Sequence, residues 1–255
     1  MLDTKRMRFP IEVILVCIRC YAAYPLSYRH LDEMMQERGA VVDHSTINRW
    51  TIRFLPLLEK VFRKFKRPVG SSWRMDETYI RISGQWKYLY RAVDKSGKTI
   101  DFLLTANRDK GAAMRFFEKA MEGNGLPEKV AMDKSGANKA AIDQIINDKH
   151  IAIQVRQIKY LNNIVEQDHR AIKRQTRPTL GFKSFHAAKS VLAGIELMHM
   201  IKKGQMKIAG GEDMSFANLI TNEPQLSLPS ETASAASELR RQPSASAWLP
   251  SQIVD

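Results

Sequence analysis

The chain has 255 residues and a formal net charge of +13, with 40 Lys and Arg against 27 Asp and Glu. The basic excess lies in residues 1–206, whereas residues 207–255 are mildly acidic. Such a balance favours a polyanionic partner, in particular nucleic acid. No uninterrupted apolar run is long enough for a membrane span, so we expect no membrane association. No signal peptide is indicated, and the scarcity of cysteine argues against a disulfide-stapled secreted protein, so we expect a cytoplasmic location.

The two cysteines, Cys17 and Cys20, have the spacing of half a zinc site. No second pair follows, and neither His30 nor His44 completes a zinc-finger arrangement. Both cysteines lie in the apolar helical run 11–24, so we interpret them as buried free thiols.

Residues 1–62 predict a helical domain with three helices, at about 11–22, 28–39 and 44–55. Helix-capping and helix-stopping residues separate them: Pro25, Ser27, Gly39, Asp43 and Pro56. Two helices joined by a short turn that contains Gly have the helix-turn-helix pattern. An ordinary helical hairpin fits this pattern equally well.

The helix-turn-helix interpretation assigns a small core and an outward face. The expected core comprises Leu31, Met34, Val42, Ile47 and Trp50. The residues expected to face outward and contact base edges are His44, Ser45, Asn48 and Arg49. A basic linker, residues 63–72, follows, and Lys64, Lys66 and Arg67 can either contact phosphates or be solvated charge.

From residue 73 to residue 206 the pattern predicts a mixed α/β domain. Three strands (72–82, 85–93 and 99–105) form a meander and are followed by alternating helices and strands. The helices are expected at 109–122, 137–147, 163–175 and 185–203, and the strands at 129–133 and 151–156. Residues 207–255 are rich in Ser, Ala and Pro, a composition typical of a disordered tail.

Two aspartates occupy special positions in these strands. Asp76 lies mid-strand, where a carboxylate is costly unless it is paired or bound to a cation. Asp133 ends a short apolar strand, at the edge where sites form in open α/β sheets. If the two strands are neighbours, the aspartates meet. Alternation predicts that only one of Asp76 and Glu77 points into a given site.

A third acid, Glu166, begins the helix 163–175. Arg170 and Lys173 continue its face at i+4 and i+7, whereas Asp168 points elsewhere. A capping box with Asn163 is the alternative role for Glu166. Three converging carboxylates need cations, and hard oxygen ligands suit Mg²⁺ or Mn²⁺, with two ions able to drive phosphoryl transfer. No phosphate-binding Gly-Lys-Ser/Thr loop occurs, so we expect no nucleotide cofactor.

Several segments resemble DDE-type bacterial insertion-sequence transposases, and within them the insertion sequence six family. They include Val42–Trp50, Met75–Tyr79, Tyr88–Asp94, Ile158–Asn163 and Leu180–Ser184. The resemblance implies a ribonuclease H-like, retroviral-integrase-like catalytic core behind a helix-turn-helix. It places the catalytic, metal-binding acids on Asp76, Asp133 and Glu166, and a DNA-contacting basic residue on Lys173.

The resemblance also implies the reaction and its partners. These are binding of double-stranded DNA at terminal inverted repeats, 3′-end cleavage, and strand transfer into target DNA with cointegrate formation in the bacterial nucleoid. Synapsis of two DNA ends predicts at least a dimer. The stretch Ser135–Asn138 departs from the Ala-Pro-containing stretch of many members.

Two alternatives remain from the sequence. One is an inactive or repurposed transposase that acts as a DNA-binding repressor and has no need of the acids. The other is a ribonuclease H-like nuclease or resolvase that cuts without joining.

Overall fold

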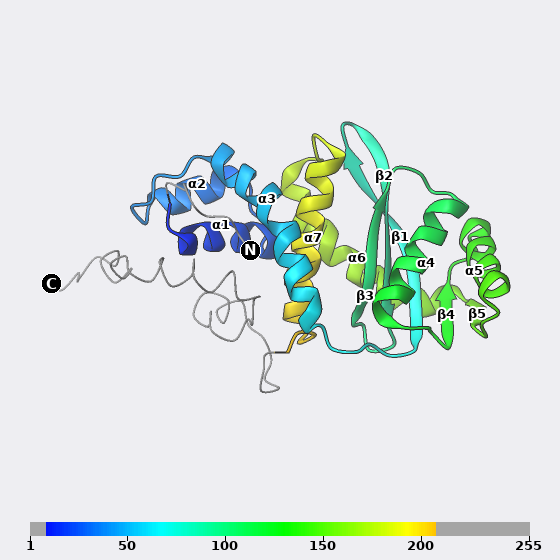
Figure 1. Cartoon of the computed structure of the whole chain (residues 1–255). Coiled ribbons are helices and arrows are strands. Elements are labelled where there is room, and N and C mark those ends of the chain that lie inside the picture. The colour runs from blue at the N-terminus through cyan, green and yellow to red at the C-terminus, as the bar shows by residue number, and fades with distance from the viewer. Residues whose placement is uncertain (1–8, 208–255) are drawn as a thin grey trace.

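The computed structural model describes residues 9–207, and Figure 1 shows a helical N-terminal part beside a sheet with helices on both faces. The predicted tail, apart from Lys207, lies outside the described residues. The N-terminal part contains α1 (Ile11–Ala23), α2 (Tyr28–Gln36) and α3 (His44–Phe62). The remaining elements are η1 (Arg63–Phe65), β1 (Ser72–Ile82), β2 (Gln85–Asp94), β3 (Thr99–Thr105), α4 (Lys110–Asn124), β4 (Lys129–Met132), α5 (Gly136–Lys149), β5 (Gln154–Gln157), η2 (Lys159–Asn162), α6 (Asn163–Thr176), η3 (Arg177–Thr179) and α7 (Phe185–Lys202).

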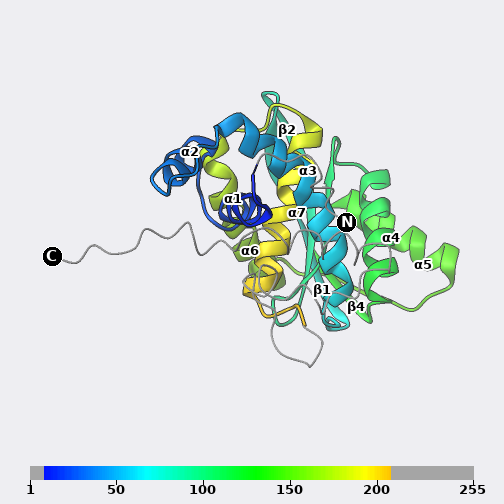
Figure 2. The same ribbon diagram turned by 60° about the vertical axis from the view of Figure 1, so that its left-hand side comes forward.

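The sheet has five strands in the order β3-β2-β1-β4-β5. The first three form an antiparallel meander, and β4 and β5 run parallel to β1. Figures 1 and 2 place α6 and α7 on one face of the sheet and α4 and α5 on the other. This arrangement confirms the predicted ribonuclease H-like mixed sheet behind an all-helical segment.

Local capping signals set the starts of the N-terminal helices. The Ser27 hydroxyl accepts a hydrogen bond from the His30 amide, and the Asp43 carboxylate accepts from the amides of Ser45 and Thr46. The predicted helix end at Pro56 is wrong, because α3 continues to Phe62. Proline removes one helical hydrogen bond, but the residues around it gain burial that outweighs this loss. Those buried residues are Leu55, Leu58 and Phe62.

The N-terminal helices share a hydrophobic core with the sheet. Helix α3 packs along α7, where Leu55 faces Gly194, and the same cluster reaches Ile80 and Leu89 of the sheet. The predicted helix-turn-helix core is also buried, except that Met34 is half-buried. The helical part is therefore fixed against α7 rather than joined only through the linker. The division into a separate helical domain, residues 1–62, stays a prediction.

Other core expectations are met. Val191, Leu192, Ile195 and Met198 of α7 are buried, as predicted. Both cysteines are free thiols, but only Cys17 is buried as predicted, and Cys20 is half-buried. Burial raises the pKa of the Cys17 thiol to about 12, as expected for a packing residue. None of the helices described is both long enough and apolar enough to cross a bilayer.

Candidate active site

Two neighbouring strands bring Asp76 and Asp133 together. Strands β1 and β4 pair in parallel, with Arg74 opposite Ala131, and each aspartate lies two residues further along its chain. Carboxylate oxygens of Asp76, Glu77 and Asp133 all lie within 4.8 Å of one another. The expectation that the two aspartates meet is confirmed.

Glu77 belongs to this acidic cluster, so the prediction that only one of Asp76 and Glu77 could point into the site is wrong. Alternation fixes the direction of each Cβ, but Asp133 lies just past the end of β4, where carboxylates from both faces can approach it. The Glu77 side chain is only 3% exposed. It accepts a hydrogen bond from Asn138 (Nδ2 to Oε2, 3.0 Å) and pairs with Arg108.

Arg108 and Asn138 are functional candidates that the sequence did not identify. The Arg108 guanidinium bridges two acids, since it pairs with Glu77 and lies 3.5 Å from Asp133 (Nη2 to Oδ2). Asn138 is fully buried and closes the stretch 135–138 that departs from the family pattern. Through Asn138, the stretch 135–138 therefore holds Glu77 in place. No local pattern in the sequence predicts this role.

The electrostatics of the cluster act most strongly on Asp76. Burial, followed by the charges of Glu77, Asp133 and, more weakly, Glu166, raises the pKa of Asp76 to about 7. A carboxyl group in this state favours either a proton or a bound cation. The site therefore has the character of a cation-binding centre whose acids are incompletely neutralised.

Glu166 lies in the first turn of α6 and is exposed, as are Arg170 and Lys173 on the same face. The alternative role in a capping box is not realised, because Asn162 is the N-cap and no side chain caps the helix. Glu166 is outside the group of three acids that lie within 4.8 Å, yet its charge contributes to the raised pKa of Asp76. It therefore approaches the cluster from α6.

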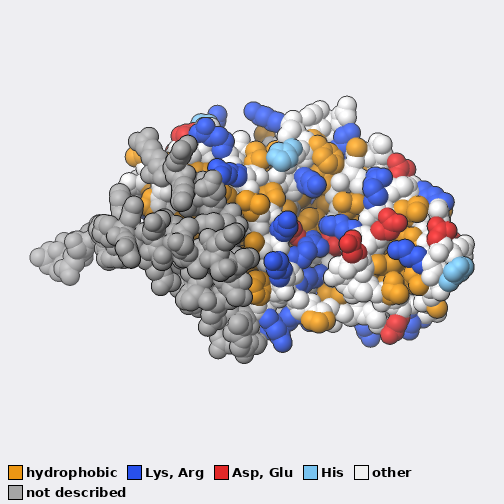
Figure 3. Space-filling view, in the orientation of Figure 1, with side chains coloured by type: hydrophobic (Ala, Val, Ile, Leu, Met, Phe, Trp, Pro, Cys, Tyr) orange, Lys and Arg blue, Asp and Glu red, His pale blue; other side chains and the backbone are white. Residues whose placement is uncertain are grey.

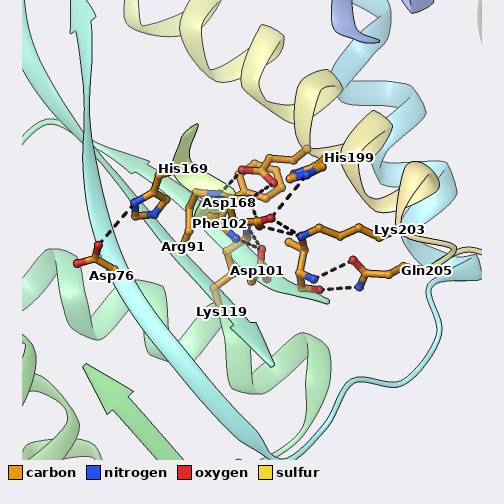
Figure 4. A network of polar contacts seen from close by, with 12 residues as sticks. Asp76, Arg91, Asp101, Phe102, Lys119, Asp168, His169, His199, Lys203 and Gln205 are labelled. Carbon is orange, nitrogen blue, oxygen red and sulfur yellow. Dashed lines mark hydrogen bonds and ion pairs between the residues drawn. The ribbon is translucent and has the colours of Figure 1, made fainter. Parts of the chain in front are cut away.

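A buried ionic network anchors α6, as Figure 4 shows. Arg91 on β2 is completely buried and donates to Asp168 (Nη2 to Oδ2, 2.9 Å) and to Glu196 (Nε to Oε1, 2.6 Å). Lys203, just beyond α7, donates to the same Asp168 oxygen at 2.8 Å. As predicted, Asp168 points away from Glu166, and it ties α6 to the sheet and to α7.

His169, the next residue, faces the active site. Its Nδ1 lies 3.6 Å from Asp76 Oδ2 (Figure 4). Burial, with the nearby charges of Arg91 and Lys173, lowers the pKa of His169 to about 3, so the ring is neutral at physiological pH. Sequence analysis missed this residue because scattered histidines gave no pattern.

The expected DNA-contacting residues of α3 lie on its outer side. His44, Ser45 and Arg49 are exposed and Asn48 is half-buried. The His44 ring lies 3.4 Å from Asp32 of α2 (Nδ1 to Oδ2), so the two helices are linked at this point. Their contact with DNA stays a prediction.

The basic linker divides into two kinds of residue. Lys64 is exposed. Lys66 instead donates from Nζ to the Ile100 carbonyl (2.5 Å) and to Asn124 Oδ1 (2.6 Å), and burial lowers its pKa to about 8. Arg67 is half-buried, and its amide donates to the Gln205 carbonyl. The Lys66 ammonium is thus engaged within the protein.

Figure 3 shows further Lys and Arg side chains gathered near α3 and α7.

Comparison with known proteins identifies the family. A family model described as a DDE domain matches residues 70–205. The transposase for the insertion sequence-like element IS431mec of Staphylococcus aureus is 39% identical over 203 residues, which cover 77% of this chain and 87% of that protein. The chain belongs to the DDE transposases of the insertion sequence six family. A DDE transposase is a polynucleotidyl transferase, and the chain is therefore an enzyme of DNA transposition.

Two further matches were found, one to a curated protein and one to a solved structure. The transposase of IS257 in transposon Tn4003 of Staphylococcus aureus is likewise 39% identical over 203 residues, with the same coverage. Among solved structures, the catalytic core domain of HTLV-2 integrase in complex with magnesium aligns with a TM-score of 0.41 and 15% identity. The alignment covers 58% of this chain and 95% of that one.

Proposed function

We propose that this DDE transposase binds the terminal inverted repeats of an insertion sequence, cleaves their 3′ ends and joins them to target DNA, by a replicative route through cointegrates. The acidic cluster, in which Asp76 and Glu77 of β1 meet Asp133 just past the end of β4, with Glu166 beside it, carries the proposal. Arg108 offsets only part of the mutual repulsion of these acids, since the pKa of Asp76 stays raised to about 7.

The proposed cofactor is Mg²⁺ or Mn²⁺, as two ions held by Asp76, Asp133 and Glu166. The donor set fits, because all three ligands offer hard oxygen atoms and Asp76 is incompletely neutralised. Such ions, when bound, activate an attacking hydroxyl and stabilise the leaving oxygen. Asn138 and Arg108 hold Glu77 at the border of this centre.

The protein residues around the acids orient the DNA. Arg170 and Lys173 share the exposed face of α6 with Glu166, and we assign Lys173 to a phosphate near the scissile bond. Neutral His169 packs beside Asp76 without adding a competing positive charge. The acids thus keep their capacity for cations, while the basic side chains stay on the DNA side.

Recognition of the element ends is assigned to α3 and the linker. His44, Ser45, Asn48 and Arg49 would contact base edges, and Lys64 would contact phosphates. Lys66 and Arg67 extend the basic stretch, but the partners of Lys66 within the protein favour a structural role for its charge. The proposed setting is a bacterial cytoplasm, on the nucleoid.

The test is strand transfer in vitro with a labelled element end, a supercoiled target and Mg²⁺. We expect joined product from the wild-type protein and none from Glu166→Gln, with end binding retained. The matched control is Glu118→Gln, which changes an exposed glutamate of α4 and should join normally. Binding without joining in the wild-type protein would instead support the repressor alternative, and cutting without joining would support a nuclease.

Synapsis of two ends requires at least a dimer on DNA. Light scattering of the protein bound to paired ends should give a mass of two or more chains. A single chain on two ends would contradict this part of the proposal.

A further inference from the structure

The β1–β2 hairpin carries an aromatic surface beyond the acidic cluster. Tyr79 lies directly opposite Tyr88, and Arg81 lies directly opposite Trp86. Residues opposite each other in an antiparallel pair share a face of the sheet. We call these four residues, Tyr79, Arg81, Trp86 and Tyr88, the hairpin surface.

The rings of this surface are unusually exposed. Trp86 is 60% exposed and Tyr79 is 48% exposed. The Tyr79 ring contacts both neighbours, with centroids 6.3 Å from Trp86 and 5.4 Å from Tyr88. Contiguous exposed aromatic side chains of this size mark an interaction site.

The exposure does not come from a loosely held hairpin. The alternate residues of the same strands, including Ile80, Ile82 and Leu89, are buried in the core shared with α7. Ile82 also bridges to Phe182 in the segment before α7. One face of the hairpin is therefore fixed, and the other presents its rings to solvent.

The hairpin surface is continuous with the candidate active site. Glu77 precedes Tyr79 by two residues on the same face, a separation of about 7 Å along a strand. Arg108, which pairs with Glu77, is 35% exposed. Burial opposes its charge, whereas Glu77, Asp133 and, more weakly, Tyr79 raise the pKa of Arg108, and its Nη2 lies 3.5 Å from Asp133 Oδ2. The aromatic rings and the acidic cluster therefore form one continuous surface.

We propose that the hairpin surface binds unpaired nucleotides next to the scissile phosphate, with bases stacked on Tyr79 and Trp86 and phosphates near Arg81 and Arg108. This inference rests on the proposed strand-transfer function, for which it names the form of the substrate. A protein ring can stack on a base only after that base leaves its own stack, so the DNA end is opened where it is bound.

The charge around the rings favours nucleic acid over a second copy of the chain. Arg81 and Arg108 flank the aromatic side chains, and aromatic rings combined with basic groups are typical of single-strand binding. The chain has a net charge of +13. Two copies meeting at a basic patch would repel each other, whereas a phosphate backbone would be attracted.

The test compares two probes, a labelled oligo(dT) single strand and a hairpin duplex of equal nucleotide count, by fluorescence anisotropy with the full-length protein. Trp86→Ala and Tyr79→Ala should each weaken single-strand binding about tenfold while duplex binding changes less than about twofold. The ring-retaining controls, Trp86→Phe and Tyr79→Phe, should bind the single strand nearly as the wild-type protein does. Thermal melts establish that each variant is folded.

The outcomes separate this inference from the proposed function. If the wild-type protein does not join DNA but loss of either ring selectively weakens single-strand binding, the proposed function fails and the stacking surface stands. If joining is normal and the alanine variants bind the single strand as the wild-type protein does, the inference alone is overturned. A reduced mass of Trp86→Ala in light scattering, with unchanged DNA binding, would also overturn it, because the surface would then be a contact between copies.

Discussion

Asp76 on β1 and Arg91 on β2 lie directly opposite each other in the sheet, and their side chains meet consecutive residues of α6. Arg91 binds Asp168, and Asp76 lies 3.6 Å from His169. Two neighbouring strands thus hold one turn of the helix that also carries Glu166. The position of Glu166 therefore depends on an ion pair, Arg91 with Asp168, that is buried away from solvent.

Arg91→Lys should destabilise the protein although it keeps the charge. The guanidinium binds Asp168 and Glu196 at once, and a lysine ammonium cannot reproduce that fork. Leaving a buried carboxylate without its partner costs about 3 kcal/mol. Urea unfolding should show this loss for Arg91→Lys. The same change at exposed Arg81 on the neighbouring strand is the control and should be nearly neutral.

Asp76→Asn should make the protein more stable and inactive. The raised pKa, about 7 against an ordinary 3.8, means that ionised Asp76 destabilises the fold. This destabilisation is absent below pH 3.8, the ordinary pKa of the group. It grows as the pH rises towards 7 and is complete above pH 7. At pH 8 the gain from Asp76→Asn should be about 2–4 kcal/mol by denaturant unfolding, and it should shrink at pH 5. Joining of DNA should be lost.

A metal titration supplies the second half of this experiment. Mg²⁺ should raise the melting temperature of the wild-type protein, since it binds the folded acids, and should raise that of Asp76→Asn much less. Asp143→Asn is the control, because Asp143 pairs with Lys139 on α5 and is half-exposed. Equal stabilisation of Asp76→Asn and the wild-type protein by Mg²⁺ would place the metal elsewhere.

The sequence predicted the strands, the caps and the meeting of Asp76 with Asp133 because each depends on local pattern or on the pairing of neighbouring strands. It could not predict the contacts of Glu77 with Asn138, 61 residues away, or of Arg91 with Glu196, 105 residues away. Such pairs join elements whose relative placement only the packed fold determines. They leave no periodic signal along the chain.

Two local rules also failed for physical reasons. The helix-stopping preference of Pro56 was overridden by the burial of apolar side chains on both sides of it. The alternation rule for Asp76 and Glu77 was applied to carboxylates, which lie further from the strand than the Cβ atoms that the rule describes. Both failures occur where tertiary packing outweighs a local preference.

The two linker lysines, Lys64 and Lys66, should have different functions, the first in DNA binding and the second in stability. Lys64→Ala should weaken DNA binding and reduce the salt slope by about 0.9, the value for one phosphate contact. Lys66→Ala should leave that slope unchanged but cost about 1–3 kcal/mol in stability, because the Ile100 carbonyl and Asn124 lose their donor. Salt-dependent binding isotherms and urea unfolding of both variants check this. A changed salt slope of DNA binding in Lys66→Ala would instead show that Lys66 contacts DNA.

Gly194→Ala should weaken the junction between the helical part and the sheet. A Cβ at this position of α7 would lie 2.4–2.8 Å from three side-chain atoms of Leu55 on α3, and Leu55 is fully buried. Relief requires α3 to shift, at a cost of about 1–3 kcal/mol. Gly136→Ala is the matched control, since a Cβ there meets nothing within 4 Å in the first turn of α5 and should be neutral or stabilising. Denaturant unfolding measures both variants, and limited proteolysis between α3 and β1 locates the loss. A neutral Gly194→Ala would mean that α3 and α7 can separate without cost, and the shared core would then not hold α3, the helix proposed to contact DNA, in place.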